Sequence, residues 1–268
     1  MPNIPIASDA GAYAALPGVK LWFVDTGGAG APVVLLHPNT GTVAIWEHQI
    51  AAFAQAGYRV IAFDRRGWGN STADPGSDGQ PGSVAGDLDA LADFLKLAPF
   101  HLLGVAGGGF AALDYAAWRP QRLRSLIVGG STGAFADKEV TDIIERIAIP
   151  EIRKQPPHYR ELGPSYRAAD PEGTRRWIEI DAQARQPGTA FQPLLRTPNT
   201  LAKIATFPTP TLIIAAGADL LAPPALMQVW AAHLQRHEWA VIHDAGHAMA
   251  WEQPGAFNDT VLDFLRRH

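Results

Sequence analysis

The chain has 268 residues, of which 47% are hydrophobic and 18% charged, so it holds enough apolar material for one large buried core. A formal net charge of −4 argues against a basic face for nucleic acid or for an anionic membrane. No cysteine occurs, which excludes disulfides, thiolate metal sites and cysteine nucleophiles. The start, Met1-Pro-Asn-Ile-Pro5, lacks the pattern of a signal peptide, and no apolar run approaches the roughly 20 residues of a membrane-spanning helix. We therefore expect a cytoplasmic protein whose partner is a small molecule, and neither nucleic acid nor membrane.

Short apolar runs alternate with longer segments of helical period along most of the chain. This alternation predicts an α/β protein with a mainly parallel sheet flanked by helices. The expected strands are Lys20–Val24, Val33–His37, Tyr58–Asp64, Phe100–Val105, Ser125–Gly129, Thr211–Ala216 and Trp239–His243. The expected helices are Ile45–Ala56, Ser83–Leu97, Phe110–Arg119, Pro224–His233 and Pro254–Arg267.

The alternation breaks between residues 133 and 207, where eight prolines separate short helical pieces. We expect this segment to be a helical cap, or lid, inserted into a core formed by residues 1–132 and 208–268. The segment holds eleven Lys and Arg against ten Asp and Glu. This balance is typical of solvated helix faces rather than of a dedicated anion site.

The run Gly-Val-Ala-Gly-Gly-Gly at residues 104–109 lies between an expected strand and an expected helix. A strand, a sharp glycine-rich turn and a helix make up the G-x-S-x-G turn that presents a nucleophilic serine, but here Ala106 stands at the central position. The run does not have the G-x-G-x-x-G spacing of a dinucleotide site and does not follow the first strand. We expect no cofactor and no metal.

Two later loops supply a carboxylate and an imidazole. Asp219 follows the expected strand Thr211–Ala216, where it can orient a histidine or, alternatively, cap the helix beginning near Pro224. His247 follows Gly246 in the loop between the last expected strand and the last expected helix. His243 competes with His247, but we expect it to be packed within its strand.

The loop after Val33–His37 can aim a backbone N–H at a developing oxyanion, with the residue after the nucleophile position as the second donor. This reasoning assigns Asn39 and Gly107 to the oxyanion hole, because Pro38 has no N–H. The candidate walls of an apolar pocket are His37, Trp68, Tyr159, Trp177 and Trp251, with Phe191.

Five segments, taken in order, resemble the α/β-hydrolase superfamily over nearly the whole chain. They are the stretch from His37 to Trp46, Asp64-Arg-Arg-Gly-Trp-Gly, the glycine-rich run around Ala106, Gly217-Ala-Asp219, and the stretch from Gly246-His247 to Pro254. The resemblance includes esterases, enol-lactonases, cofactor-free haloperoxidase-type members and carbon–carbon bond hydrolases. It implies the α/β-hydrolase fold, with the helical lid inserted between the sixth and seventh sheet strands. It also implies a triad of the nucleophile position 106, Asp219 and His247.

Two positions depart from the family pattern: Pro38 replaces a glycine, and Ala106 replaces the serine. With serine at position 106, the resemblance implies hydrolysis of a small, mostly apolar ester or lactone through an acyl-enzyme. The runner-up is carbon–carbon bond hydrolysis of a ring-cleavage product. Three explanations of Ala106 stay open: an inactivating Ser→Ala change, a serine-independent enzyme of the cofactor-free dioxygenase type, and a non-catalytic ligand-binding protein.

Overall fold

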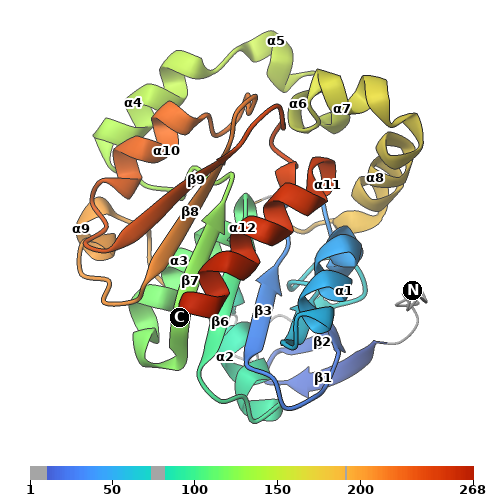
Figure 1. Ribbon diagram of the computed structural model, residues 1–268, viewed down its shortest axis with the longest axis vertical. Helices are drawn as coiled ribbons and strands as arrows, with labels where there is room; N and C mark the ends of the chain where they lie inside the picture. The colour runs from blue at the N-terminus through green and yellow to red at the C-terminus, as the bar shows by residue number, and fades with distance from the viewer. Residues whose placement is uncertain (1–10, 74–81, 191) are drawn as a thin grey trace.

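A computed structural model describes residues 11–73, 82–190 and 192–268. The described residues form a nine-stranded sheet with helices on both faces (Figure 1). The strands are β1 (Ala12–Leu16), β2 (Val19–Asp25), β3 (Pro32–Leu36), β4 (Arg59–Phe63), β5 (Thr72–Ala73), β6 (Phe100–Val105), β7 (Leu123–Gly129), β8 (Thr211–Ala216) and β9 (His237–Ile242). Among these residues, no helix combines the length and the apolar character needed to cross a membrane.

The strand order is β1-β2-β4-β3-β6-β7-β8-β9, with β5 paired to β2. The pairs made by β2 are antiparallel, and every pair from β4 to β9 is parallel. The central strands β3, β6 and β8 are buried along their whole length. This explains their continuous apolar sequences, since a parallel strand covered on both faces exposes neither set of side chains.

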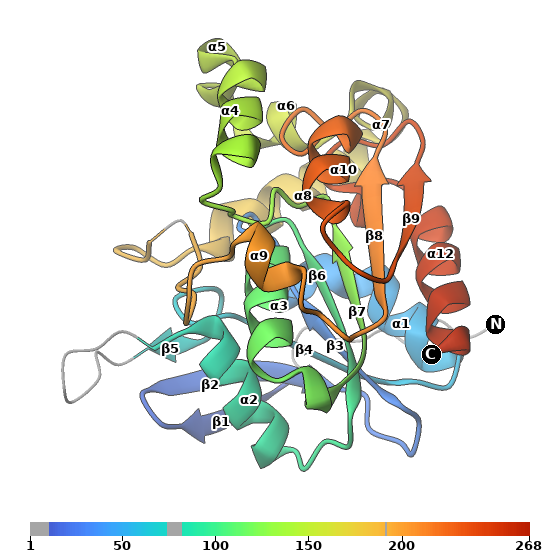
Figure 2. The ribbon, with the colours of Figure 1, turned by 90° about the vertical axis from the view of Figure 1, so that its left-hand side faces the viewer.

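Helices cover the two faces of the sheet in separate layers. In Figure 2, α1 and α12 lie on one side of the sheet and α2 and α3 on the other. The helices of the core are α1 (Glu47–Gln55), α2 (Val84–Phe94), α3 (Gly107–Trp118), α10 (Pro224–Ala231), α11 (Met249–Glu252) and α12 (Pro254–Arg267), with the 3-10 turns η1 (Val43–Trp46) and η2 (Pro120–Arg122). Two apolar clusters result, one with α2, α3 and α10 and the other with α1, α11 and α12.

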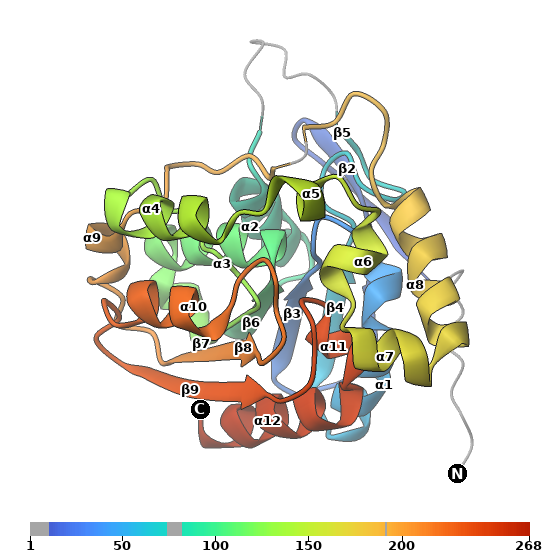
Figure 3. The same ribbon diagram turned by 90° about the horizontal axis from the view of Figure 1, so that it is seen from above.

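In the described residues between β7 and β8 there are six helices. They are α4 (Lys138–Ile147), α5 (Pro150–Arg153), α6 (Pro157–Glu161), α7 (Pro164–Ala169), α8 (Pro171–Ala184) and α9 (Leu201–Ile204). From α4 to α8 they form an arc around the carboxyl ends of the central strands (Figure 3). Four of the six, α5 to α8, start at a proline, whose missing N–H has no role in a first helical turn. When the two-residue β5 is left out, β7 and β8 are the sixth and seventh strands of the chain.

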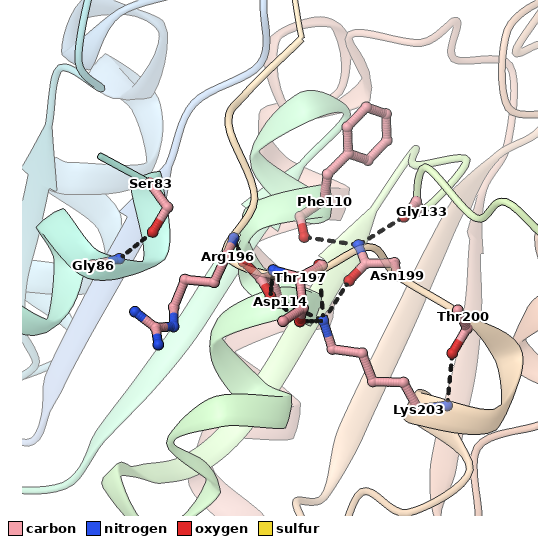
Figure 4. Close-up of polar contacts among 10 residues, drawn as sticks. All are labelled: Ser83, Gly86, Phe110, Asp114, Gly133, Arg196, Thr197, Asn199, Thr200 and Lys203. Carbon is pink, nitrogen blue, oxygen red and sulfur yellow. Dashed lines mark hydrogen bonds and ion pairs between the residues drawn. The ribbon is translucent and has the colours of Figure 1, made fainter. Parts of the chain in front are cut away.

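The segment that returns from these helices is tied to α3 by a buried carboxylate (Figure 4). Asp114 of α3 accepts hydrogen bonds from the Arg196 N–H (2.6 Å) and from the Thr197 hydroxyl, and it pairs with the Lys203 ammonium at 2.9 Å. The Asn199 side chain donates to the carbonyl oxygens of Phe110 and Gly133. This network therefore joins α3, the start of the inserted segment and its end.

The sequence located seven of the nine strands of the described residues with small errors at their ends. β6 and β8 have the expected bounds, but the expectation missed β1 and β5. α3 begins at Gly107, three residues before the expected start, because the glycine-rich turn is itself the first helical turn. The expectation for His243 was wrong: β9 ends at Ile242, and His243 is exposed.

Candidate functional site

Ala106 occupies the sharp turn between β6 and α3. Its backbone has φ +48° and ψ −118°, a conformation that non-glycine residues adopt only where the surrounding structure enforces it. The Ala106 N–H donates to the Gly129 carbonyl at 2.9 Å, and the Ser131 hydroxyl donates to the Ala106 carbonyl at 2.8 Å. The end of β7 thus holds the strained turn on both sides of residue 106.

The glycines around Ala106 are needed because other groups approach their backbone closely. A Cβ atom at Gly108 would lie 2.1 Å from the Leu36 carbonyl oxygen, and one at Gly107 would lie 2.1 Å from Asn39 Oδ1. The start of α3 can therefore pack against β3 and its following loop only without side chains at these positions.

Asp219 and His247 meet at the carboxyl ends of the strands. Asp219 follows β8, and its Oδ1 accepts the N–H groups of Leu221 (2.7 Å) and Ala222 (2.9 Å). Its Oδ2 lies 2.8 Å from Nδ1 of His247, which leaves Nε2 as the imidazole nitrogen available to the cavity. Asp219 does not cap α10. Its carboxylate accepts N–H groups of its own loop and contacts the imidazole, while α10 begins only at Pro224.

Charges around His247 favour its protonated form. Burial opposes a charge on the imidazole, but the Asp219 carboxylate, with Glu161 and Glu252 nearby, raises the pKa of His247 to about 9. Burial also raises the pKa values of Glu161 and Glu252. Three carboxylates therefore act on the imidazole, and of these Glu161 lies outside the five family segments.

The loop after β3 is held by a buried arginine. Arg65 Nη2 donates to the carbonyl of Pro38 (3.1 Å) and to Oδ1 of Asn39 (2.9 Å). The guanidinium also lies 4.4 Å from the centre of the Trp68 ring, and burial lowers its pKa to about 9. His37 lies below this loop, where Nε2 accepts the Arg65 N–H at 2.9 Å. Arg65 thus fixes the loop at the place where proline replaces the family glycine.

Two cavities meet at residue 106. The outer one, of about 460 Å³, is lined by Asn39, Gly107 and residues of the inserted helices and their flanking loops. The inner one, of about 20 Å³, has mostly apolar walls that include Trp46, Trp177 and Trp251. Four residues line both cavities: Thr40, Ala106, Glu161 and His247. The triad position therefore lies at the junction of the two cavities.

The inserted helices are attached directly to the loop that carries His247. The Glu161 carbonyl accepts the Ala248 N–H at 3.0 Å. Glu252 Oε2 accepts the N–H of Gly163, in the inserted segment, at 3.0 Å and the N–H of Gly246 at 2.9 Å. One carboxylate thus joins the segment between α6 and α7 to the residue before His247.

Three of the expected pocket residues lie elsewhere. Tyr159 is 51% exposed, and its ring lies 4.2 Å from the ring of His158 on the outside of α6. Trp68 is buried, but its Nε1 donates to the Asn39 carbonyl and its ring borders a separate pocket. His37 is buried beneath the loop. Trp177 and Trp251 do line the inner cavity, while Phe191 lies outside the described residues.

Sequence reasoning missed Glu161, Thr40 and Arg65. Glu161 is 6% exposed, and its Oε2 accepts a hydrogen bond from the Thr40 hydroxyl at 2.6 Å. Thr40 follows the expected oxyanion residue Asn39, so its position in the loop was a usable signal. Glu161 has no motif around it, because it faces the site through a contact between segments 121 residues apart. In the described part of the chain, no cluster of three or more His, Cys, Asp and Glu side chains could hold a metal ion.

Comparison with known proteins decides the family. A sequence model described as the alpha/beta hydrolase family matches residues 33–260. The chain belongs to this family. The predicted α/β-hydrolase fold is confirmed, and the fold and relatives are those of a hydrolase of this type.

Similar proteins include several kinds of hydrolase. The chain is 27% identical to the 2-hydroxy-6-oxononadienedioate/2-hydroxy-6-oxononatrienedioate hydrolase of Escherichia coli K12, over 93% of this chain and 92% of that one. Its structure is similar to that of a thermophilic esterase from Thermogutta terrifontis (TM-score 0.80, 25% identity, 96% and 98% covered). It also shares the fold of the enol-lactonase from Burkholderia xenovorans LB400 (TM-score 0.77, 23% identity, 95% and 100% covered).

Proposed function

We propose that the site is that of a serine-type hydrolase for a small, mostly apolar ester or lactone, with alanine in the place of the nucleophile. The observation that carries this proposal is the strained backbone of Ala106 beside the Asp219–His247 pair. A strained turn of this kind exposes its central side chain so that it can act as a nucleophile, and a methyl group cannot act as one. The N–H groups of Asn39 and Gly107 are the proposed oxyanion donors.

In this proposal His247 takes the proton from a serine hydroxyl at position 106 and returns it to the leaving group, while Asp219 orients the imidazole. The outer cavity of about 460 Å³ holds the ester or lactone, and the inner cavity of about 20 Å³, lined by Trp177 and Trp251, admits only a small apolar end of the substrate. The cap of residues 133–207 closes the outer cavity. Because a triad without its nucleophile loses on the order of 10⁶-fold in kcat, the present chain is expected to bind such esters with very little turnover.

The decisive experiment is Ala106→Ser. We expect the variant to hydrolyse p-nitrophenyl acetate or butyrate and to react with a fluorophosphonate probe, because the turn and the imidazole are already in position. Ala106→Gly is the matched control: it changes the same residue without adding a hydroxyl, and it should neither turn over esters nor react with the probe. Adding His247→Gln to Ala106→Ser should abolish both signals.

The same variant tests which bond is cleaved. The relative from Escherichia coli is named for the hydrolysis of a ring-cleavage product, so a vinylogous diketone of that kind is the second substrate. Turnover of the diketone, with esters left intact, would reassign the site to carbon–carbon bond hydrolysis. A folded Ala106→Ser protein that cleaves neither substrate and does not react with the probe would contradict the proposal.

A further inference from the structure

Glu161 places a buried carboxylate at the site, outside all the family motifs. The residue ends α6 and is 6% exposed, and its side chain lines both cavities beside Ala106 and His247. Within the described residues, no lysine or arginine forms an ion pair with it, and its side-chain hydrogen bond comes from Thr40. Carboxylates are rarely buried unless they are paired, and the positively charged groups that act on Glu161 are His247 and Arg160. The buried carboxylate is therefore coupled to the imidazole of the site.

The position of the carboxylate is set from two sides. The Thr40 hydroxyl binds Oε2 at 2.6 Å, and the Glu161 carbonyl accepts the Ala248 N–H at 3.0 Å. The first contact fixes the carboxylate against the oxyanion loop. The second fixes its backbone against the residue that follows His247. Glu161 and His247 are therefore held relative to one another by their own backbones.

The surrounding charges suit a group that exchanges protons. Burial raises the pKa of Glu161, while His247, the Thr40 hydroxyl and Arg160 act in the opposite direction. The Asp219 carboxylate also raises the pKa of Glu161. Glu161 in turn acts on Asp181, whose pKa is raised to about 6 by burial and by this charge. A carboxyl whose pKa moves toward neutral pH is effective as both a proton acceptor and a proton donor.

We propose that Glu161 and His247 form a proton-transfer pair that acts on a carbonyl compound bound over the methyl group of Ala106. Glu161 removes a proton from the carbon next to the carbonyl. The C–H electron pair forms a carbon–carbon double bond, and the carbonyl π pair moves to the oxygen. The Nε2–H of protonated His247 and the N–H of Gly107 stabilise this oxyanion. The protonated Glu161 carboxyl exchanges its proton with solvent and then delivers a solvent-derived proton to the carbon, which restores the carbonyl compound. No oxidant or reductant is needed.

The substrate class follows from the walls of the cavities. The inner cavity is lined mainly by aromatic and aliphatic side chains, among them Ile45, Val105, Trp177 and Trp251. Its volume of about 20 Å³ admits only one small apolar group, so the outer cavity of about 460 Å³ must hold the rest of the substrate. Together the two cavities suit a small, mostly apolar ketone or keto ester with an acidic C–H. This activity needs no serine and goes beyond the proposed ester hydrolysis.

The test is solvent deuterium exchange followed by proton NMR. The unaltered chain is incubated in D2O with cyclohexanone, 4-phenylbutan-2-one and ethyl 2-methylacetoacetate as probes, beside protein-free buffer. We expect exchange next to the carbonyl to be faster than in buffer with at least one probe. The enzymatic rate should fall about a hundredfold or more in Glu161→Gln, because a side chain that cannot take up the proton loses general base catalysis. Glu161→Asp should retain part of the rate.

Glu145→Gln is the matched control, since Glu145 is an exposed carboxylate on α4, and it should leave the exchange rate unchanged. Melting temperatures within a few degrees of the unaltered chain would show that each variant is folded. Exchange no faster than in buffer with all three probes, or equal rates in Glu161→Gln and the unaltered chain, would overturn the inference. Ester hydrolysis by Ala106→Ser is measured separately, so either proposal can fail while the other stands.

Discussion

His247 combines a deep position with an unusual number of carboxylate neighbours. Asp219 binds Nδ1 at 2.8 Å, and the charges of Glu161 and Glu252 further raise the pKa of the imidazole. In a triad with serine, the hydroxyl would provide a partner for Nε2. Here position 106 has only a methyl group, so it offers no hydrogen-bond partner to Nε2, and the carboxylates act on the imidazole. A site of this kind favours imidazolium below a pH of about 9, and the neutral imidazole that can accept the proton of a serine is favoured only above it.

The raised pKa of His247 predicts a stability change with pH. The pKa is about 9 in the folded chain against an ordinary value of 6.5, so folding favours the protonated form. The resulting stabilisation is fully present below pH 6.5 and is lost as the pH rises through about 9. Its size is on the order of 3 kcal/mol. Urea unfolding at pH 6 and at pH 9.5 should therefore show a larger loss for the unaltered chain than for His247→Gln.

His237→Gln is the matched control for this measurement, because His237 is an exposed histidine at the start of β9. It should preserve the pH dependence of the unaltered chain. If His247→Gln also preserved the pH dependence, the charge on His247 would not be coupled to folding. The argument that the three carboxylates stabilise the protonated imidazole would then be wrong.

At the scale of elements, α3 is anchored at its first turn and at its middle. Its first turn packs against β3 through glycines, and its middle carries Asp114, which is fully buried. Because Asp114 binds Arg196 N–H, Thr197 and Lys203, it joins the helix behind the turn to the segment before β8. The position of Ala106 therefore depends on contacts from three separate parts of the chain.

This network predicts a large effect for Asp114→Ala. The change removes the acceptor of the Arg196 N–H and of the Thr197 hydroxyl, and it removes the carboxylate paired with the Lys203 ammonium. We expect a loss of about 3 kcal/mol in the free energy of unfolding. Asp142→Ala is the control, since Asp142 forms an i,i+4 pair with Lys138 on the half-exposed face of α4. It should cost about 0.5 kcal/mol or less. Similar losses in the two variants, measured by urea unfolding, would show that the buried network stabilises the fold no more than an exposed ion pair does.

The parts of the site that sequence could predict are those with a local pattern. β6 and β8 are continuous apolar runs, and the turn at Ala106 and the loop at Asp219 follow them directly. Glu161 could not be found this way, because its partner Thr40 is 121 residues away. The aromatic residues of the inserted helices differ in this respect. Tyr159 lies on α6, whose five residues are too few to show a helical period, whereas the buried Trp177 belongs to a stripe with Ile180 and Ala184 on the 14-residue α8.

At the scale of the whole molecule, the inserted helices and the core meet at the loop that carries His247. Glu252 of α11 accepts N–H groups from Gly163 and from Gly246, one on each side of this boundary. Glu161, Thr40 and Ala248 make the neighbouring contacts. Movement of the helices away from the core would therefore break bonds to the residues on both sides of His247. Opening of the outer cavity and the position of the imidazole are coupled through this carboxylate.

The coupling predicts the behaviour of Glu252→Gln, which keeps the shape of the side chain and removes its charge. Hydrogen bonds to a charged acceptor contribute roughly twice as much as those to a neutral one, so the two bonds together should weaken by about 1–2 kcal/mol. Amide hydrogen exchange at Gly163 and at Gly246 should then be roughly tenfold faster, because about 1.4 kcal/mol corresponds to a factor of ten. Asp259→Asn on the exposed face of α12 removes a carboxylate nearby in sequence and should leave both amides unchanged. Faster exchange at Gly246 alone would show that the inserted helices hold their place without Glu252, and the coupling between cavity opening and His247 would be wrong.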